Sequence, residues 1–403
     1  MILENYIKVL EVKKTPFYIF DKMGFIKNYK YFEEQMKKVY PKYLLSYSYK
    51  TNYTPYICKI VKEMGGYAEV VSDMEYSLAK KIGYSNDKII YNGPAKGEML
   101  YEHLLNKGIV NIDSIDEAEI VKKIAKKYSD HLFKVGLRIN LDLGGDFISR
   151  FGLDQTSKDI ENTIKLLKKC TNIKIVGLHC HISRNRSLEA WRKRAEVMLE
   201  VADTYLEDVP EYISLGSGMF GDMPKELKEQ FEDVPSYQEY AEAALKPIFN
   251  HYREKQRQPF VYTEPGTTLV ARYLNFITKV LSIKNIRGRN IANLDGSFEN
   301  LGEICALKKL PIKTLKSSKG IYFDKIDLMG YTCLEQDLMY GDYKGNLSKG
   351  DILMFENVGG YSIVSKPQFI KPNCSIISLE ENGQIKEIMR EETFEDIFSK
   401  FIF

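Results

Sequence analysis

The sequence has little that would suggest a membrane, a secretion route or a nucleic-acid surface. No stretch approaches the roughly 18 consecutive apolar residues of a membrane span. The N-terminal residues lack the basic start, long apolar run and small-residue cleavage site of a secretory signal. The net charge is only +3, which creates no strong field for nucleic acid or anionic lipid. We therefore expect a protein that acts without a membrane or a nucleic acid.

Cysteine and histidine are also scarce. The six cysteines are scattered without C-x-x-C spacing, which is typical of free thiols in a reducing cytoplasm. Only five histidines occur. His179 and His181 are two residues apart on a predicted strand and share one face, but a zinc or iron site needs further ligands. We therefore expect no metal site, which disfavours a metal-dependent hydrolase.

Strand–helix alternation dominates the first two thirds of the chain. Amphipathic stretches such as Asp116–Lys127 and Leu188–Tyr205 separate short β-like runs. The predicted strands are Tyr43–Lys50, Tyr67–Ser72, Ile89–Gly93, Val110–Ser114, Lys134–Asn140, Lys174–Ser183, Tyr212–Ser217 and Phe260–Gly266. Eight alternations predict an α/β fold, a closed (β/α)8 TIM barrel. On alternation alone, a doubly wound open sheet is the alternative.

The pattern changes after about residue 270, where short β-like runs are joined by turns rich in Gly, Asn and Ser. The runs are Leu274–Ile283, Asp351–Glu356 and Ser362–Val364, and the turns include 287–290 and 341–346. We expect three parts: an N-terminal segment (1–24) that adds a strand to the β domain, the barrel (25–270) and a C-terminal mainly β domain (271–403).

Polar residues end nearly every predicted strand of the barrel. They are Lys50, Ser72, Asn92, Asp113, Arg138, His181, Ser217 and Glu264. The carboxyl ends of barrel strands converge on the face where active sites form. Any one of these residues could simply meet a polar loop. A set that includes lysine, arginine, histidine and glutamate favours an active site.

Lys50 and Glu264 indicate the chemistry. A desolvated lysine is nucleophilic and suits covalent bonding to a carbonyl group. A buried glutamate that faces a cationic heterocycle would keep that ring protonated, and a protonated pyridine is the electron sink that loss of CO2 requires. Each residue also has a structural explanation, as a strand-capping lysine and as a carboxylate at a turn.

Two loops and one cysteine add to this picture. Gly216-Ser217-Gly218 follows the seventh strand and Gly266-Thr267 follows the eighth, the usual phosphate cradle of barrels. Carboxylates near Cys333 favour its neutral thiol, which suits a proton donor better than a nucleophile. An ordinary buried cysteine is an equal alternative on local grounds.

Ordered short motifs from Pro16 to about Lys371 resemble the fold-type III pyridoxal-phosphate decarboxylases, which include diaminopimelate, ornithine and D-ornithine/D-lysine decarboxylases. The motifs are Tyr49–Asn52, Val70–Glu75, Asn92–Lys96, Val110–Glu117, Leu137–Asn140, Arg150–Gly152, Gly177–Ile182, Leu215–Gly218, Glu264–Gly266, Cys333–Asp337 and Gly359–Tyr361. The resemblance implies decarboxylation of an amino acid with pyridoxal 5′-phosphate as cofactor.

The resemblance also implies roles for individual residues. Lys50 would form the Schiff base with the cofactor, His181 would stack on its ring and Glu264 would pair with the ring nitrogen. Further cofactor contacts are expected from Gly216, Ser217, Gly218, Gly266, Thr267 and Tyr361. Cys333 would protonate the substrate carbon after CO2 leaves, and substrate contacts are expected from Arg138, Glu335 and Asp337. Members are homodimers in which the cysteine segment of one subunit completes the other subunit's site.

Three departures from the family pattern affect the expected specificity. Ser183-Arg184 replaces the usual Gly-Ser, and Thr267 replaces a phosphate-binding arginine, so we expect Arg184 to supply the lost cation. Leu334 stands where members that bind a distal amine often have an acid, which is displaced here to Glu335. The substrate is expected to be a basic diamino acid, with a lean toward the D-ornithine/D-lysine branch, or a conjugated relative.

Two alternatives within the fold stay open. A racemase typically pairs the ring nitrogen with a cation, which Glu264 disfavours. A cofactor-less regulatory homologue would not need Lys50, His181, Glu264 and Cys333 together.

Overall fold

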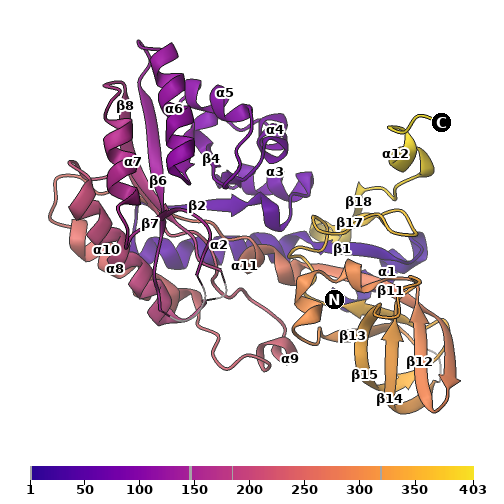
Figure 1. Ribbon diagram of the computed structural model, residues 1–403. Helices are drawn as coiled ribbons and strands as arrows, with labels where there is room; N and C mark the ends of the chain where they lie inside the picture. Colours follow the sequence, from indigo (N-terminus) through magenta and orange to yellow (C-terminus); the bar gives the residue numbers. More distant parts are fainter. Residues whose placement is uncertain (1, 145–147, 184, 318–319) are drawn as a thin grey trace. The chain divides into compact units, whose positions relative to one another are not determined.

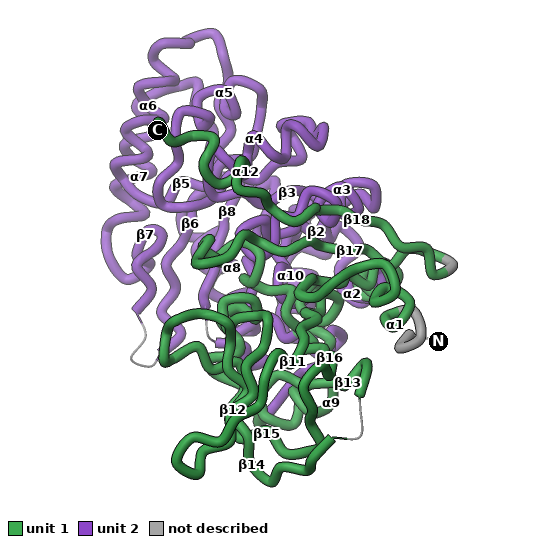
Figure 2. Tube along the Cα trace, turned by 90° about the vertical axis from the view of Figure 1, so that its right-hand side faces the viewer, with its two compact units in different colours: residues 1–28, 221–232, 269–403 green, residues 29–220, 233–268 purple. Residues whose placement is uncertain are grey.

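The computed structural model describes residues 2–144, 148–183, 185–317 and 320–403, and the chain forms two compact units (Figure 2). One unit comprises residues 29–220 and 233–268, and the other comprises residues 1–28, 221–232 and 269–403. Among the described helices, none combines the length and the apolar character that crossing a bilayer requires.

The first unit contains a closed barrel of eight parallel strands, which confirms the predicted fold. Neighbouring strands pair in chain order, and β10 pairs with β2 to close the ring. The strands are β2 (Tyr43–Ser48), β3 (Tyr67–Val70), β4 (Ile89–Tyr91), β5 (Ile109–Ile112), β6 (Phe133–Asn140), β8 (Ile173–Cys180), β9 (Tyr212–Ser214) and β10 (Phe260–Thr263). Every predicted barrel strand is present. The two-residue strand β7 (Leu153–Asp154), which pairs with β6, was not predicted.

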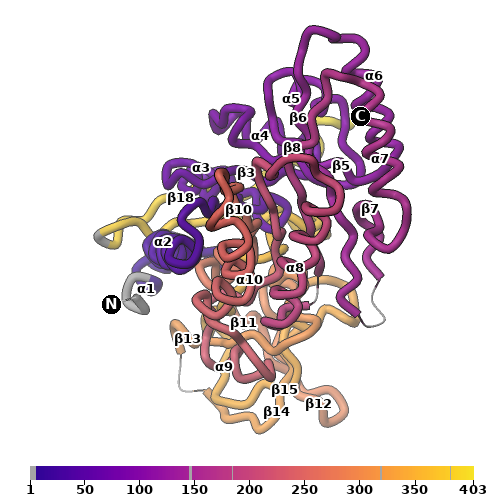
Figure 3. The backbone as a smooth tube through the Cα atoms, turned by 90° about the vertical axis from the view of Figure 1, so that its left-hand side faces the viewer, coloured from indigo at the N-terminus to yellow at the C-terminus, as the bar shows by residue number. Residues whose placement is uncertain are grey.

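Helices cover the outside of the barrel (Figures 1 and 3). They are α2 (Lys22–Val39), α3 (Pro55–Glu63), α4 (Asp73–Ile82), α5 (Met99–Leu105), α6 (Ile115–Lys127), α7 (Asp159–Leu167), α8 (Leu188–Tyr205) and α10 (Tyr237–Tyr252). Serine hydroxyls cap α4, α6, α8 and α10 by accepting a backbone N–H from the first turn, which fixes where these helices begin. Helices α8 and α10 lie side by side, with the rings of Trp191 and Tyr240 5.9 Å apart.

Apolar side chains form one layer inside the barrel, and polar side chains form the next layer toward the carboxyl ends of the strands. The buried cluster contains Ile90, Val176, Tyr212 and Tyr262. Gly177 is needed here because a Cβ on it would lie 2.1 Å from the Tyr212 ring. Since side chains alternate along a strand, residues two positions further on, such as Ser214 and Glu264, face inward at the carboxyl ends. The polar site is therefore built on a packed base.

The second unit is built on a nine-stranded mixed sheet in the order β15-β14-β12-β11-β1-β17-β18, with β16 pairing with β11 and with β13. Strand β1 is antiparallel to β11 and parallel to β17. The strands are β1 (Phe17–Asp21), β11 (Leu274–Ile286), β12 (Arg289–Leu294), β13 (Ile312–Lys316), β14 (Ile321–Met329), β15 (Leu338–Leu347), β16 (Ile352–Phe355), β17 (Ile376–Leu379) and β18 (Ile385–Met389). The short helices are α1 (Ile2–Val12), α9 (Lys225–Lys228), α11 (Thr267–Val270) and α12 (Phe394–Phe398).

Two predictions in this unit were wrong. Residues 341–346 do not form a turn but lie within β15, where pairing with β14 through several bulges accommodates the glycines. Ser362–Val364 is not a strand, because its chain turns: Tyr361 has a φ of +61° and the Ser362 hydroxyl donates to the Val358 carbonyl. The turn predicted at 287–290 does join β11 to β12, with positive φ at Arg287 and Gly288.

Candidate active site

Lys50 lies on a short 3-10 turn, Tyr49–Thr51, directly after β2 rather than within the strand. Its Nζ lies 2.6 Å from Oε2 of Glu69, which is almost fully buried on β3. The Ser48 hydroxyl donates to the same carboxylate oxygen at 2.5 Å. The Lys50 side chain retains 32% exposure. The amine is therefore held in place but remains accessible at the carboxyl end of the barrel.

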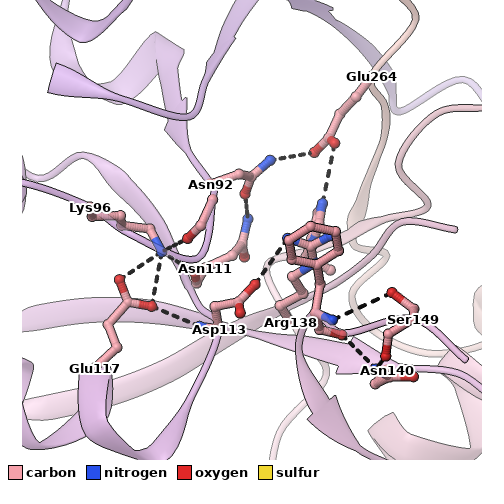
Figure 4. A network of polar contacts seen from close by, with 12 residues as sticks. Asn92, Lys96, Asn111, Asp113, Glu117, Arg138, Asn140, Ser149 and Glu264 are labelled. Carbon is pink, nitrogen blue, oxygen red and sulfur yellow. Dashed lines mark hydrogen bonds and ion pairs between the residues drawn. The ribbon is translucent and has the colours of Figure 1, made fainter. Parts of the chain in front are cut away.

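Glu264 follows β10 and is the buried carboxylate of the site (Figure 4). It accepts hydrogen bonds from Asn92 Nδ2 at 3.0 Å and from the Ser214 hydroxyl at 2.9 Å, and its Oε2 lies 3.2 Å from His179 Nε2. Burial alone would raise the pKa of Glu264. His179 and Lys50 outweigh that effect, so the pKa lies well below its usual value. The carboxylate is ionised at neutral pH.

One asparagine joins Glu264 to Glu69. Asn92 Nδ2 also donates to Glu69 Oε1 at 3.2 Å, while Asn92 Oδ1 accepts from Asn111 Nδ2 at 2.8 Å. Asn111 in turn accepts from the Tyr212 hydroxyl at 2.6 Å. All five residues in this chain of hydrogen bonds are buried and paired (Figure 4 shows Asn92, Asn111 and Glu264). The network fixes the direction of each donor, because both carboxylates can only accept.

His181 is a neutral imidazole that links two loops. Its Nδ1 accepts a hydrogen bond from the Ser217 backbone N–H at 3.0 Å. Burial, and after it the charge of Lys50, holds the pKa of His181 well below the usual 6.5. With Nδ1 accepting, the proton lies on Nε2. An uncharged planar ring held in this way can stack on a flat ligand.

Glycines allow close approach of backbone at the predicted phosphate cradle. Gly216 and Gly218 have φ of +68° and +111°. A Cβ on Gly216 would lie 2.3 Å from the Cys180 carbonyl, and one on Gly266 would lie 2.0 Å from the Thr51 hydroxyl. Thr267 begins α11. Arg184, the predicted replacement cation, lies outside the described residues.

Arg138, on β6, forms a buried ion pair with Asp113. Its Nη1 donates to Asp113 Oδ1 at 2.9 Å, and its guanidinium lies 4.7 Å from the centre of the Phe151 ring. Asp113 is anchored in turn, because its backbone N–H donates to Glu117 at 2.7 Å. Figure 4 shows this chain of contacts beside Glu264. The predicted substrate residue thus has a fixed orientation.

Lys96 forms a second buried ion pair in the same region, with Glu117. Its Nζ has no exposed surface and donates to both carboxylate oxygens of Glu117, at 2.7 and 2.9 Å, and to the carbonyls of Gly93 and Asn111, each at 2.9 Å. Burial lowers the pKa of Lys96, and the Glu117 carboxylate opposes this effect. The ion pair ties the loop after β4 to the start of α6 (Figure 4).

Three predicted residues of the other unit lie in the segment between β14 and β15. Cys333 and Glu335 are exposed, and Asp337 is buried. The Asp337 carboxylate accepts from the Phe298 N–H at 2.8 Å, from the Thr332 N–H at 3.0 Å and from the Thr332 hydroxyl at 2.6 Å. These bonds hold the turn that presents Cys333. Tyr361 lies outside this segment, at the start of another turn, and is half-buried.

The structure thus brings Lys50, His181, Ser217 and Glu264 to one end of the barrel. Ser72, by contrast, is the N-cap of α4 and accepts from the Glu75 N–H, so its polarity serves the helix. The sequence analysis did not single out Glu69, Asn111 or Arg194. Asn111 could have been found by counting back two positions from Asp113, because inward residues recur every second position. Glu69 lies three positions before Ser72, so the predicted strand end placed it on the opposite face. Within the described ranges, no three metal-ligating side chains gather.

The chemistry of this set fits pyridoxal 5′-phosphate. An accessible amine can bind its aldehyde, an ionised buried carboxylate can pair with a protonated ring nitrogen, and a neutral imidazole can stack on the ring. The glycine turns at Gly216 and Gly218 let a backbone N–H approach a phosphate. The site therefore has a suitable partner for each part of this cofactor.

Comparison with known proteins supports this interpretation. Residues 29–271 match the family model described as pyridoxal-dependent decarboxylase, pyridoxal binding domain. Diaminopimelate decarboxylase of Aquifex aeolicus is 25% identical, over 95% of this chain and 90% of that protein. L-glutamyl-[BtrI acyl-carrier protein] decarboxylase of Niallia circulans is 23% identical, over 95% and 93%. The crystal structure of diaminopimelate decarboxylase from M. jannaschii has a TM-score of 0.87 at 23% identity, covering 98% of this chain and 94% of that one.

Proposed function

Because the chain belongs to the pyridoxal-dependent decarboxylases, we propose that Lys50 and Glu264 form the centre at which it removes the carboxyl group of a basic amino acid. The enzyme uses pyridoxal 5′-phosphate and produces an amine and CO2. The observation that carries the assignment of this site is the buried, ionised Glu264 at the barrel mouth that also holds Lys50.

Each residue of the site has a distinct task in this proposal. Lys50 would supply the amine that holds the cofactor, His181 would lie against its ring and Glu264 would keep a proton on the ring nitrogen. When bound, pyridoxal 5′-phosphate accepts the electron pair that the departing CO2 leaves behind. The phosphate would be bound by Gly216, Ser217, Gly218, Gly266 and Thr267, and the proposal adds Arg184 and Tyr361 as further phosphate contacts. Arg138, Glu335 and Asp337 contribute to substrate recognition or support the groups that do.

Glu264 favours decarboxylation over racemisation. A carboxylate beside the ring nitrogen stabilises the protonated ring, which makes the electron sink stronger. A cationic partner would favour the unprotonated ring and a weaker sink. The ionised state of Glu264, maintained by His179 and Lys50 against its burial, therefore suits loss of CO2.

Cys333 is the proposed acid that protonates the substrate carbon. Its thiol is exposed, and Asp337 holds its turn in place. The proposal places it in the active site of a second copy of the chain, in a homodimer where each barrel domain (25–270) binds the cofactor and each β domain (271–403) presents the cysteine. The six cysteines are all free thiols, which fits a cytoplasmic enzyme.

Two substrate classes are supported by different observations: free diamino acids and conjugated amino acids. Diaminopimelate decarboxylases are among the most similar relatives and favour a free diamino acid. Leu334, in place of an acid that could bind a distal amine, favours a substrate whose far end is not a free ammonium group. A relative that acts on an aminoacyl carrier protein shows that the family includes such substrates.

The decisive experiment measures release of CO2 and amine from L- and D-lysine, L- and D-ornithine, meso-diaminopimelate, and L- and D-arginine. We expect activity on one of them, abolished by Lys50→Ala. Glu264→Gln should lower kcat roughly 100-fold or more, because the preorganised charge is lost. The matched control Glu242→Gln, on the exposed face of α10, should not. Full activity in Glu264→Gln would refute the proposed site. Cofactor binding without CO2 from the panel would point to the conjugated class.

A further inference from the structure

Arg194 is a fully buried arginine on α8, in the barrel unit. Its guanidinium donates hydrogen bonds to four backbone carbonyls. Nη1 donates to Ser217 at 2.8 Å and to Leu215 at 3.5 Å, and Nη2 donates to Ile182 at 2.9 Å and to Asn185 at 3.0 Å. Two of these carbonyls belong to the loop after β9 and two to the loop after β8. One side chain therefore binds both loops that surround the predicted phosphate cradle.

The charge of Arg194 has no counter-ion within the described part of the chain, where no carboxylate lies within ion-pairing distance of it. Burial lowers the pKa of Arg194 to about 10, so the group stays protonated at neutral pH. Burying a cation without an opposite charge is unfavourable. A buried positive charge that no protein group neutralises is explained if an anion binds close to it.

One of these carbonyl bonds also orients a backbone donor. In a trans peptide, the C=O of one residue and the N–H of the next point in opposite directions. By drawing the Ser217 carbonyl inward, Arg194 turns the N–H group of Gly218 away from itself. The Gly216 N–H, by contrast, donates to the Ser214 hydroxyl at 3.5 Å. A Cβ on Gly218 would lie 3.6 Å from Arg194 Nη2, so the cation lies directly behind this turn.

We propose that Arg194 is the positioning residue of the cofactor's phosphate site, supplying positive charge and aiming the N–H group of Gly218. The inference rests on the proposed function of this site. It also adds a source of positive charge to the proposed Arg184 at a site where Thr267 stands in place of the family's arginine after Glu-Pro-Gly.

The test compares binding of pyridoxal 5′-phosphate with binding of pyridoxal, which lacks the phosphate, by absorbance of the cofactor-free protein. Arg194→Gln should weaken pyridoxal 5′-phosphate binding by about 10- to 100-fold, the range for losing a hydrogen-bonded charge, and should leave pyridoxal binding nearly unchanged. Arg194→Lys, which keeps the charge, should lose less. Arg192→Gln, exposed on the same helix, is the matched control. Equal losses for both ligands would overturn the inference.

A second measurement needs no variant, in case Arg194→Gln does not fold. The chain has one tryptophan, Trp191, whose ring lies 4.3 Å from the Arg194 guanidinium. Inorganic phosphate added to the cofactor-free protein should change Trp191 fluorescence saturably, and protein preloaded with pyridoxal 5′-phosphate should not respond. No response in the cofactor-free protein would overturn the inference. Failure of the wild-type protein to bind pyridoxal 5′-phosphate at all would instead refute the proposed function.

Discussion

Removing one partner of the buried ion pair between Lys96 and Glu117 should strongly destabilise the barrel, because the other charge is then left unpaired. Lys96→Met removes the cation and leaves the Glu117 carboxylate, whose side chain is only 9% exposed, without its partner. It also removes the donor for the carbonyls of Gly93 and Asn111. Breaking one side of a buried pair costs about 3–5 kcal/mol. We expect a loss of that size in the free energy of unfolding of the barrel.

A double-mutant cycle isolates the pair. Replacing both partners, in Lys96→Met/Glu117→Met, leaves no unpaired charge, so the double variant should be less destabilised than the sum of the single variants by about 2–3 kcal/mol. Urea unfolding followed by Trp191 fluorescence measures it, because the single tryptophan lies in the barrel unit. Lys123→Met, at an exposed position on α6, is the control. A loss below about 1 kcal/mol in Lys96→Met, or additive effects in the cycle, would refute the reasoning.

Three further predictions test other parts of the site. Gly216→Ala should weaken cofactor binding, measured by absorbance titration, because the new Cβ would lie 2.3 Å from the Cys180 carbonyl at a φ of +68°; normal binding would contradict this account. Asp337→Asn should loosen its turn and speed alkylation of Cys333, followed by mass spectrometry, while cofactor affinity stays unchanged; an unaltered alkylation rate would show that the carboxylate does not hold the turn. Burial raises the pKa of Glu75 from 4.5 to about 7. The folded protein therefore keeps a proton that the unfolded chain releases, and stability should fall as the pH rises from 5 to 8. Glu75→Gln should remove roughly 3 kcal/mol of that decline, from about 2.5 pKa units at 1.36 kcal/mol each; melting curves with an unchanged pH dependence would exclude this role.

The barrel could be predicted from the sequence because its signals are local. A strand buried on both sides and a following amphipathic helix each leave a periodic pattern, and Leu188–Tyr205 matches α8 residue for residue. The polar ends of strands follow from the same alternation, which is why Lys50, His181 and Glu264 were found. Strand boundaries were less accurate, since β2 ends at Ser48 and the lysine lies on the turn beyond it.

Other features depend on contacts between residues far apart in the sequence. The turn composition of 341–346 is overridden by pairing with β14. Arg194 follows Arg192 and Lys193, but it lies three residues after Trp191 and four before Met198, on the buried face of α8. Two distant loops place four carbonyls around its charge. The helical pattern therefore indicates that position 194 is buried, whereas the carbonyl groups that accept from its guanidinium depend on the tertiary structure.

The hydrogen bonds around Glu69 would allow Lys50 to leave its ion pair with this carboxylate, as the proposed function requires. The Lys50 ammonium shares Glu69 Oε2 with the Ser48 hydroxyl, while Asn92 donates to Oε1. If Lys50 left this position to bind the cofactor, as proposed, Glu69 would keep two donors, so the buried carboxylate would not be left unsatisfied. Asn92 cannot rotate to follow the lysine, because Asn111 fixes its carbonyl oxygen. In this proposal Lys50 moves, whereas Glu69, Asn92 and Asn111 keep their hydrogen bonds. Glu264, which accepts from the same Asn92, would then keep its position.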